Sequence, residues 1–224
     1  MISFFKKYKF FGITLLILSI IIMAAMYNIL NTEQPLPIFQ PASVNNELVD
    51  STVQHVRQYH KIADFSLINQ NGDTISQNSY KDKIYVADFF FTTCQTICPI
   101  MTDHMIEIQN KIMDDEEVLL LSHTVTPDID DVAQLNRYAK IKGVNASKWN
   151  LVTGEKKQIY DLARQSYMAV KDNGDGGPFD MIHTENFMLI DKERQIRGYY
   201  DGTDPEEIDR LLEDIKILKA SYKD

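Results

Sequence analysis

The chain has 224 residues and a formal net charge of −9, from 23 Lys and Arg residues against 32 Asp and Glu residues. Because a general nucleic-acid-binding protein needs a basic surface, this acidic balance excludes that class, and no nucleic-acid partner is expected. Hydrophobic residues make up 44% of the sequence, which excludes a disordered chain, and two cysteines are too few for a disulfide-stapled mini-domain or a four-thiolate zinc site.

The N-terminal segment is expected to form a membrane anchor. Residues 10–32 carry no charged side chain, and a helix of this length would span about 34 Å, enough for a bilayer core of about 30 Å. The apolar run ends in Met23-Ala24-Ala25-Met26-Tyr27, a poor match to the small-x-small cleavage site of a secretory signal peptide. No cysteine near this segment could accept the lipid of a lipoprotein. We therefore expect an uncleaved transmembrane helix, with a cleaved signal peptide as the alternative.

The charges that flank this segment predict its orientation. Lys6, Lys7 and Lys9 precede it and Glu33 follows it, so the positive-inside rule places residues 1–9 in the cytoplasm and exports the body. No Arg- and Ser-rich transit peptide precedes the anchor, which favours a bacterial protein over an organellar one. We expect a single-pass protein of the inner (cytoplasmic) membrane whose body lies in the periplasm, an oxidising space where two close cysteines can form a disulfide.

The exported part of the sequence indicates one domain behind a linker. Three prolines disfavour helix in residues 33–61, which we expect to be a linker and lead-in. No repeat or second linker follows, so residues 62–221 are expected to form a single domain. Its first feature is a predicted hairpin over residues 64–76, with the turn at Asn71-Gly72.

Strands and helices then alternate along the chain. A nearly continuous apolar run over residues 84–91 predicts a strand buried on both faces, and a helix follows to about Met113. A second core strand is expected over residues 118–122. The next helix is expected to have Thr126 as its N-cap, a proline at its first position, and an end just before Gly143.

The rest of the sequence predicts a short strand near Leu151, a helix near residues 156–164, and a final hairpin from strands at 187–190 and 195–199. The closing helix is expected to begin with a capping box from Thr203 to Glu206. Its apolar residues recur at helical spacing, namely Ile208, Leu211, Leu212, Ile215 and Leu218. Together these elements describe an α/β sandwich.

The first core strand leads directly into a cysteine pair at the start of a helix, which among α/β sandwiches indicates the thioredoxin-like (peroxiredoxin-like) fold. The expected chain adds an N-terminal hairpin to this fold and a transmembrane helix before it. Cys94 follows the first core strand, at the sheet edge where reactive groups of open α/β sheets lie. Because proline is tolerated only in the first turn of a helix, Pro99 places the helix start near Cys98. Both sulfurs are therefore expected at the positive end of the helix dipole, which favours thiolates.

The spacing of the pair leaves two chemistries open. Thiol oxidoreductases of this fold usually carry C-x-x-C, one residue shorter than the C-x-x-x-C formed by Cys94 and Cys98. The longer loop can still close a disulfide, but it also lets two thiolates spread around one metal ion. Two inert buried cysteines or a passive disulfide are a further alternative, which the position of the pair at a strand-to-helix turn disfavours.

Two motifs carry a resemblance to a known family: Thr93-Cys94-x-x-x-Cys98-Pro99, and Asp180-Met181-Ile182-His183-Thr184 before a strand. With them, about residues 60–218 resemble the SCO/SenC family, membrane-anchored copper proteins that help to assemble the dinuclear copper centre of cytochrome c oxidase. In that family the two cysteines and the histidine bind copper. The resemblance therefore implies that Cys94, Cys98 and His183 are copper ligands.

The implied third ligand, His183, follows a glycine-rich stretch at residues 172–178. A loop histidine at a strand start is ordinarily a solvated residue, but in a thioredoxin-like fold this loop lies against the cysteine turn. Two thiolates and one imidazole suit Cu(I), and Cu(II) with an added weak ligand, while zinc could also bind. The glycine-rich stretch lacks the glutamate of a calcium-binding loop, and we expect it to provide mobility for His183.

Other residues near the pair are secondary candidates. Asp88 lies in the first core strand, where burial would raise its pKa, and it is either a proton acceptor for the pair or an acid with a buried partner. Met101 and Met105 are expected in the core rather than on copper. His123 is expected near the cysteine edge as a surface or capping residue, with an outer-ligand or partner contact as the alternative. His104 is expected on an exposed helix turn, and no role is assigned to the remaining histidines, His55 and His60.

The chain departs from the family pattern at Thr126, where the family commonly has an acid before the proline. The sequence here is Val125-Thr126-Pro127-Asp128. Thr126 suits a helix N-cap, but it removes a carboxylate from the neighbourhood of the site. The three implied ligands are not affected by this departure.

Two functions from different classes compete. The first is a copper metallochaperone that binds copper through Cys94, Cys98 and His183 and passes it to the copper-bearing subunit of cytochrome c oxidase or to another acceptor. The second is a thiol-disulfide oxidoreductase that reduces the copper-ligand cysteines of an acceptor, with Cys94 and Cys98 as the redox-active pair and Asp88 as a proton acceptor. The longer cysteine spacing disfavours this enzymatic function, as does the absence of a proline directly before the strand at 187–190. A thiol reductase that keeps the pair reduced is an expected partner.

Two weaker hypotheses complete the comparison. A pure binding or redox-sensing module, in which copper is a signal and is not transferred, stays open. A peroxidase is disfavoured, because peroxiredoxins have threonine three positions before the reactive cysteine and this chain has Phe91 there.

Overall fold

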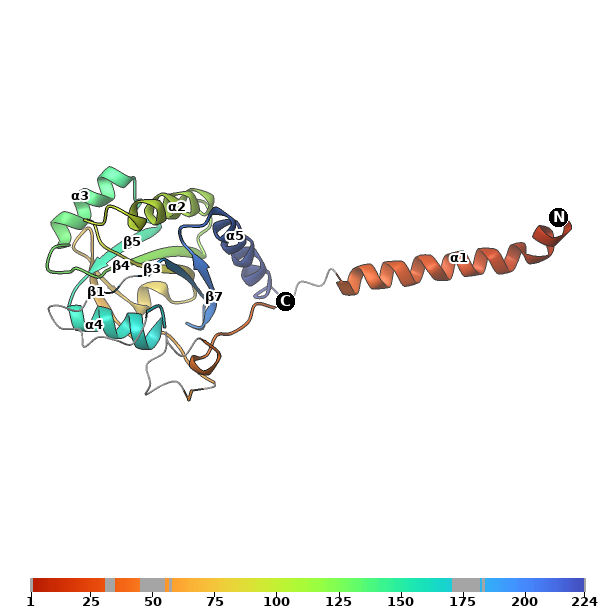
Figure 1. Cartoon of the computed structure of the whole chain (residues 1–224), viewed down its shortest axis with the longest axis horizontal. Helices are drawn as coiled ribbons and strands as arrows, with labels where there is room; N and C mark the ends of the chain where they lie inside the picture. Colours follow the sequence, from red (N-terminus) through yellow and green to blue (C-terminus); the bar gives the residue numbers. More distant parts are fainter. Residues whose placement is uncertain are drawn as a thin grey trace. The chain divides into compact units, whose positions relative to one another are not determined.

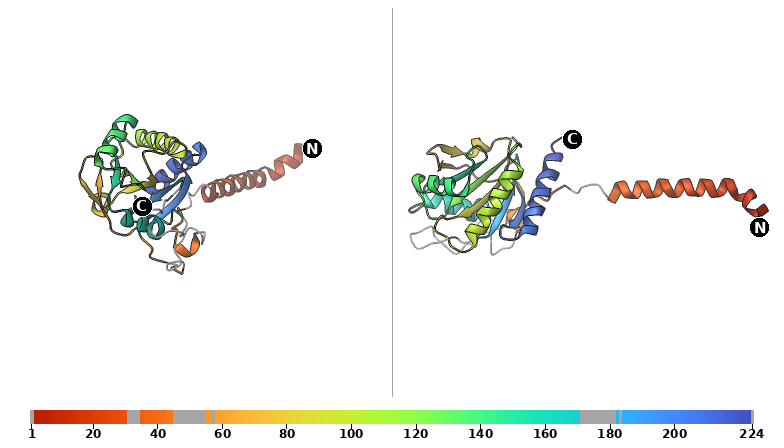
Figure 2. Two further views of the ribbon diagram at one scale, coloured as in Figure 1. Left: turned by 60° about the vertical axis from the view of Figure 1, so that its left-hand side comes forward. Right: turned by 90° about the horizontal axis from the view of Figure 1, so that it is seen from above.

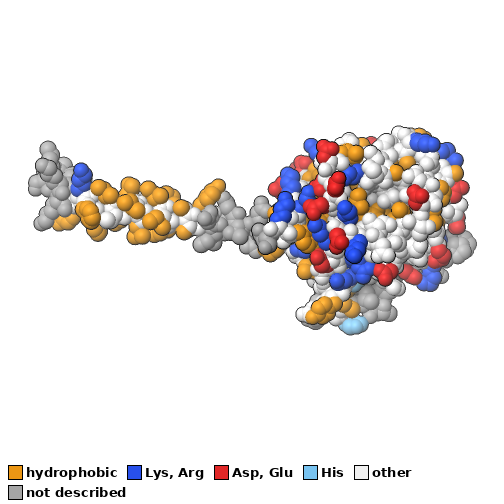
Figure 3. All heavy atoms as spheres, turned by 180° about the vertical axis from the view of Figure 1, so that it is seen from behind, with side chains coloured by type: hydrophobic (Ala, Val, Ile, Leu, Met, Phe, Trp, Pro, Cys, Tyr) orange, Lys and Arg blue, Asp and Glu red, His pale blue; other side chains and the backbone are white. Residues whose placement is uncertain are grey.

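The computed structural model describes residues 2–30, 35–44, 55–56, 58–170, 182 and 184–223. The chain divides into two compact units, Met1–Pro35 and Leu36–Asp224. The first unit is one helix, α1 (Ile2–Leu30), drawn in red in Figure 1. Its stretch Tyr8–Tyr27 is long and apolar enough to cross a membrane, and the side chains on the face shown in Figure 3 are almost all hydrophobic. The predicted helix is therefore present, and its expected end at Thr32 lies outside the described residues.

The second unit contains one seven-stranded mixed sheet in the order β2-β1-β5-β4-β3-β6-β7. Neighbours β3, β4 and β5 run parallel, and the outer strands on both sides pair antiparallel. The strands are β1 (Ser66–Asn69), β2 (Thr74–Ser76), β3 (Ile84–Phe90), β4 (Val118–Thr124), β5 (Trp149–Thr153), β6 (Asn186–Ile190) and β7 (Ile196–Asp201). The predicted core strands and the final hairpin are confirmed.

The predicted N-terminal hairpin is formed by β1 and β2. The side-chain oxygen of Asn69 accepts the backbone N–H groups of Asn71 and Asp73 at 3.0 and 2.9 Å. Gly72 has φ +86°, a left-handed conformation that glycine adopts without a steric penalty. The Asn71-Gly72 sequence thus fixes the turn as expected.

Helices cover both faces of the sheet. They are α2 (Ile97–Lys111), α3 (Val132–Lys142), α4 (Lys156–Asp161), which continues into a π-helical turn (Leu162–Ser166), and α5 (Pro205–Ala220). Helices α2, α3 and α5 pack with one hydrophobic cluster, and α4 with its π-helical turn packs with the other (Figure 1). Figure 2 shows α2 and α5 side by side on their common face.

Strand β3 lies between these two clusters. Ile84, Val86 and Phe90 belong to the α2 side, and alternate residues such as Tyr85 and Phe89 belong to the α4 side. All seven residues of β3 are buried, as the continuous apolar run predicts. The carboxyl ends of the parallel strands β3 and β4 lie at the same sheet edge, so the segments after them become neighbours.

The start of α3 differs from the sequence prediction. Thr126 is not its N-cap, because the helix begins at Val132 and the carboxylate of Asp131 accepts the N–H of Gln134 at 2.7 Å. The Thr126 hydroxyl instead donates to Asp130 at 3.1 Å, within a turn that precedes the helix. The predicted C-terminal end is correct, since Gly143 adopts φ +81° just beyond the helix.

The start of α5 also differs, by one residue. Asp204 is the N-cap and accepts the N–H of Glu206 at 2.9 Å, and Pro205 takes the first helical position. The Thr203 hydroxyl donates to Asp201 at 2.6 Å and is unavailable for the predicted capping box. The apolar stripe is as predicted, with four of its members buried and Leu212 packed against the same cluster.

The described part of the expected linker packs against the domain. Phe39 donates its backbone N–H to Ile196 of the edge strand β7 at 2.8 Å. The Arg197 guanidinium donates to the carbonyls of Leu36 and Pro37 at 2.6 and 3.0 Å. A short 3₁₀ turn, Pro41–Ser43, follows. This lead-in therefore covers an edge of the sheet that would otherwise be open to another strand.

Candidate metal centre

The two cysteines lie where β3 passes into α2. β3 ends at Phe90 and α2 begins at Ile97, so Cys94 lies in the connecting loop and Cys98 is the second residue of the helix. Pro99 occupies the third position, in the first turn, where a helix does not need the missing N–H. The start of α2 is within one residue of the sequence prediction.

The N-cap of α2 is directed at the site rather than at its own helix. Thr96 caps α2 without a side-chain hydrogen bond to the first turn. A capping oxygen ordinarily accepts the N–H of the second or third helical residue, and here the third is Pro99, which has none. The Thr96 hydroxyl instead lies 3.5 Å from the Cys94 sulfur. The Thr96 hydroxyl is thus a neighbour of the thiol rather than a cap of the helix.

The two thiols differ in pKa. Partial burial opposes ionisation of Cys94, but hydrogen bonds from the Thr96 hydroxyl, the amides of Thr96 and Cys98, and the Cys98 thiol lower the pKa of Cys94 to about 7. Burial raises the pKa of Cys98 to about 12, with further contributions from its hydrogen bond to Cys94 and from the charges of Cys94 and Asp88. The expectation of two thiolates is therefore wrong for Cys98, because its burial outweighs the helix dipole.

Cys98 is held firmly at the start of α2. Its side chain is 3% exposed and belongs to the cluster beneath α2. Its carbonyl accepts the Thr102 hydroxyl at 2.7 Å, and that hydroxyl also lies 2.7 Å from the Tyr138 hydroxyl on α3. Cys94 is more exposed. The pair therefore consists of one accessible sulfur and one buried sulfur.

Asp88 is the buried acid that the sequence indicates. It lies on β3, and its residue is 3% exposed. Burial raises the pKa of Asp88 to about 7, while a hydrogen bond with Ser122 on β4 opposes this shift. Its Oδ1 atom has no hydrogen-bond partner within the described structure. The charge of Asp88 acts on Cys98, so this carboxyl and the buried thiol are electrostatically coupled.

His123 lies in the core, and the expectation of a surface or capping residue is wrong. The side chain is 0% exposed and stacks on the ring of Phe89 at a centroid distance of 4.9 Å. The rings of Phe65 and Tyr167 meet it edge-on. Burial lowers the pKa of His123 to about 4, so it is neutral at physiological pH. Its neighbours belong to the α4 side of the sheet, whereas Cys98 belongs to the α2 side.

The remaining methionine and histidine candidates are described by their burial and their hydrogen bonds. Met101 and Met105 are buried beneath α2, as expected. The His104 ring is half-buried rather than exposed, because its Nδ1 atom lies 2.8 Å from the Gly202 carbonyl. The His60 ring lies 2.7 Å from the Ser166 carbonyl, and His55 is exposed.

The predicted third ligand, His183, lies outside the described residues, as do Asp180, Met181 and residues 172–178. Its neighbours Ile182 and Thr184 are described, and both are buried. Among the described residues no group of three His, Cys, Asp or Glu side chains could hold a metal ion. Within the described part of the chain, Cys94 and Cys98 are thus a pair of candidate ligands without a third side chain of these types beside them.

Sequence reasoning missed Asp130. This residue is 0% exposed, and its carboxylate accepts hydrogen bonds from three threonines, one of which is Thr92 in the cysteine loop. The available signal was its position four residues after Thr126, but the contact to Thr92 spans 38 residues. Local spacing does not indicate a contact of that length.

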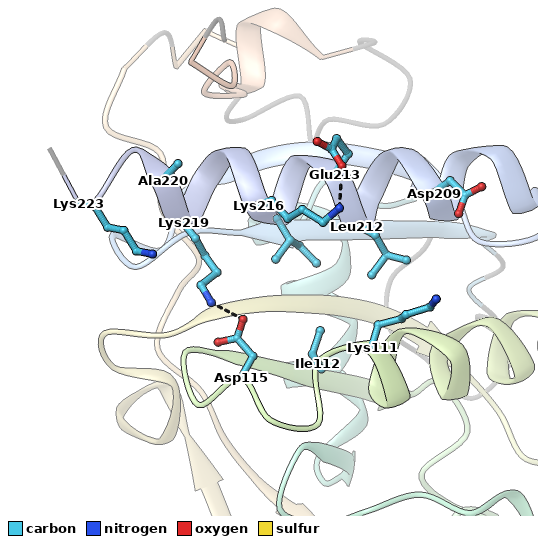
Figure 4. Close-up of a pocket in the computed structure, with 11 residues that line it drawn as sticks. Lys111, Ile112, Asp115, Asp209, Leu212, Glu213, Lys216, Lys219, Ala220 and Lys223 are labelled. Atoms are coloured by element: carbon cyan, nitrogen blue, oxygen red, sulfur yellow. Dashed lines mark hydrogen bonds and ion pairs between the residues drawn. The ribbon is translucent and has the colours of Figure 1, made fainter.

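A groove of about 680 Å³ lies at the opposite end of α2 from the cysteines, between that end and α5 (Figure 4). Lysines and acids line it together, and several are already paired, such as Lys219 with Asp115 and Lys216 with Glu213. With 15 residues, α2 is about 22 Å long, so the groove is remote from the thiols.

Known proteins resemble this chain in sequence and in fold. The sequence model of the SCO1/SenC family matches residues 53–219. A relative, the SCO1 protein homolog of Bacillus subtilis, is 30% identical over 159 residues, which cover 70% of this chain and 82% of that protein.

Two solved structures are similar as well. BsSco, a member of the Sco family of cytochrome c oxidase assembly proteins in which a disulfide switch was identified, is 29% identical with a TM-score of 0.60. The match covers 71% of this chain and 93% of that one. Arabidopsis thaliana ScoI, solved with copper bound, is 23% identical with a TM-score of 0.56, over 69% of this chain and 97% of that one, and it supports the fold.

Proposed function

Because the chain belongs to the SCO1/SenC family, we propose that it is a membrane-anchored copper metallochaperone that delivers copper during assembly of the dinuclear centre of cytochrome c oxidase. The observation that carries this proposal is the cysteine pair where β3 passes into α2, with Cys94 in the loop and Cys98 buried in the first turn of the helix. A thiolate at neutral pH is a ligand that Cu(I) prefers. Binding through both sulfurs requires Cys98 to lose its proton, so copper uptake releases a proton from the pair.

His183 is the proposed third ligand. The motif that contains it matches the family pattern, and its described neighbours in the sequence, Ile182 and Thr184, are buried in the domain. Two thiolates and one imidazole form a three-ligand set with room for an incoming donor. Copper can therefore pass to an acceptor by ligand exchange, since the new thiolate or imidazole adds before an old ligand leaves.

The proposed location is the outer side of the inner membrane. The apolar stretch Tyr8–Tyr27 supports a single anchor, and the lysines before it support a cytoplasmic N-terminus. Five residues separate the end of α1 at Leu30 from Leu36, where the domain begins. The domain is therefore tethered to the proposed anchor by a short segment of chain.

The proposal is tested in cells that lack this gene. Complementation with the wild type should restore cytochrome c oxidase activity, whereas Cys94→Ser, Cys98→Ser and His183→Ala should each restore less than about a tenth of it. His55→Ala is the matched control, because His55 is exposed and has no assigned role, and it should restore full activity. Full activity with His183→Ala, at equal protein abundance, would contradict the proposed ligand set.

A second candidate is a thiol-disulfide reductase, which the asymmetry of the pair favours. The Cys94 thiolate would attack an acceptor disulfide, form a mixed disulfide and release one acceptor thiolate. Cys98 would pass its proton to the Asp88 carboxylate and displace the second acceptor thiolate, which leaves a Cys94–Cys98 disulfide. Its pKa near 7 suits Asp88 to this transfer at neutral pH.

The reduction potential of the pair, with insulin reduction as the activity assay, separates the two functions. A reductase should reduce insulin with repeated turnover, and Asp88→Asn should slow release of the mixed disulfide without slowing its formation. A metallochaperone should show no such turnover.

A further inference from the structure

The cysteine loop is held by a carboxylate that comes from beyond the neighbouring strand. Thr92 stands two residues before Cys94, and its hydroxyl donates to Asp130 Oδ1 at 2.5 Å. The Thr92 backbone N–H donates to Oδ2 of the same carboxylate at 3.1 Å. Asp130 lies in the turn between β4 and α3 and is fully buried.

Two further threonines complete the surroundings of this carboxylate. The hydroxyls of Thr124 and Thr126 donate to its Oδ2 atom at 2.5 and 3.1 Å. All four donors are neutral hydroxyl or amide groups, three on Oδ2 and one on Oδ1, so both oxygens of the carboxylate are hydrogen-bonded. A buried carboxylate is costly unless it is fully hydrogen-bonded, so this network specifies one arrangement of the three segments it joins.

The joined segments all border the proposed site. Thr92 follows β3, Thr124 ends β4, and Gln134 of α3 adds a hydrogen bond from its side-chain amide to the Thr92 hydroxyl at 2.9 Å. The backbone of Cys94 is linked to the same region, since its N–H donates to the Phe91 carbonyl at 3.3 Å. Asp130 thus fixes the loop segment from which the accessible sulfur projects.

We propose that Asp130 is a positioning residue for the thiol pair, which sets the Cys94 sulfur relative to Cys98 through its two hydrogen bonds to Thr92. It does not touch the sulfur. Its effect on copper rests on the proposed function above, whereas its effect on closure of the Cys94–Cys98 disulfide does not. Thr126, which does not cap α3, contributes its hydroxyl to this network.

The test compares Asp130→Asn with Asp131→Asn in the full chain in detergent. Asparagine keeps the size of Asp130 but replaces one acceptor oxygen by a donor, so the Thr92 hydroxyl loses its acceptor. Asp131 is adjacent and exposed, and asparagine preserves its capping of α3. Two constants are measured: the equilibrium constant of the pair with glutathione in the absence of copper, and Cu(I) affinity against a chromophoric chelator.

Asp130→Asn should change the glutathione constant at least fivefold and weaken Cu(I) at least tenfold, while Asp131→Asn should change neither by more than twofold. Thr92→Val should reproduce the effect, and Thr92→Ser, which keeps the hydroxyl, should restore both constants. If Asp130→Asn does not fold, the two Thr92 variants alone test whether the hydrogen bond between Thr92 and Asp130 positions the thiol pair. Folded Asp130→Asn and Thr92→Val proteins with a glutathione constant within twofold of wild type would overturn the proposal. Failure of the wild type to bind Cu(I) would instead reject the metallochaperone function and leave the thiol test intact.

Discussion

At the scale of single residues, two buried titratable groups have opposite effects on how the stability of the fold depends on pH. Asp88 has its pKa raised to about 7, so its contribution to stability is present at low pH and is lost as pH rises from about 4 to 7. His123 has its pKa lowered to about 4 from 6.5, so its contribution is present above pH 6.5 and is lost as pH falls toward 4. In the wild type these two slopes largely cancel between pH 4 and 6.5.

Removing one group should expose the slope of the other. With His123→Phe, the free energy of unfolding should fall as pH rises through this window, and with Asp88→Asn it should rise. Each slope relative to wild type should be at most about 1.4 kcal/mol per pH unit. Urea unfolding of the Leu36–Asp224 unit at pH 4.5, 5.5 and 6.5 measures both. Equal pH dependence in the wild type and His123→Phe would show that His123 does not titrate as its burial requires.

The same residues show what a sequence reveals at this scale. The cysteine pair and the buried Asp88 were predictable, because a strand pattern and a proline locate them. The protonation of Cys98 was not, since the helix-dipole argument ignores how deeply the sulfur is buried. His123 was misplaced because its surroundings come from Phe65, Phe89 and Tyr167, which are distant in sequence.

At the scale of elements, periodicity predicted the helices and strands well, and helix starts were the weaker part. In both errors the sequence prediction assigned the cap to a threonine, Thr126 or Thr203, whereas a nearby aspartate caps the helix. In each case the threonine hydroxyl is bound to another aspartate, Asp130 or Asp201, through contacts that a capping pattern does not include. Local capping rules therefore identify the region in which a helix starts but not the residue that caps it.

The cap of α5 gives a test of this explanation. Asp204→Ala removes the acceptor for the Glu206 N–H and should lower the free energy of unfolding by about 1 kcal/mol. Asp204→Asn is the control and should lose only a few tenths of this, because asparagine is an equally good cap. Chemical denaturation of the Leu36–Asp224 unit measures both variants. A larger loss with Thr203→Ala than with Asp204→Ala would restore the capping box that the sequence suggested.

At the scale of the whole molecule, the Arg197 guanidinium joins the lead-in to the sheet, beside the backbone hydrogen bond from Phe39 to Ile196. Arg197 pairs with the fully buried Asp191 at 3.0 Å and also holds the carbonyls of Leu36 and Pro37. The face of the domain in Figure 3 otherwise carries interspersed acidic and basic side chains. The attachment of the lead-in thus depends on specific hydrogen bonds rather than on the net charge of the domain.

Arg197→Ala should detach the lead-in and leave Asp191 buried without its counter-charge. We expect a loss of about 3 kcal/mol in the free energy of unfolding, and faster hydrogen exchange at the Phe39 amide. Arg197→Lys keeps the charge for Asp191 but cannot reproduce the guanidinium fork, so it should recover part of the stability and little of the exchange protection. Unchanged protection of Phe39 in Arg197→Ala would show that the lead-in is held by other contacts.

The measurement that tests the central claim most directly is an anaerobic Cu(I) titration of the reduced protein against a chromophoric chelator. The account predicts tight binding of one copper ion per chain, lost at least a hundredfold in Cys94→Ser, Cys98→Ser and His183→Ala and retained in His55→Ala. Weak binding that is indifferent to His183, together with a Cys94–Cys98 disulfide that cycles readily, would contradict the metallochaperone and favour the reductase.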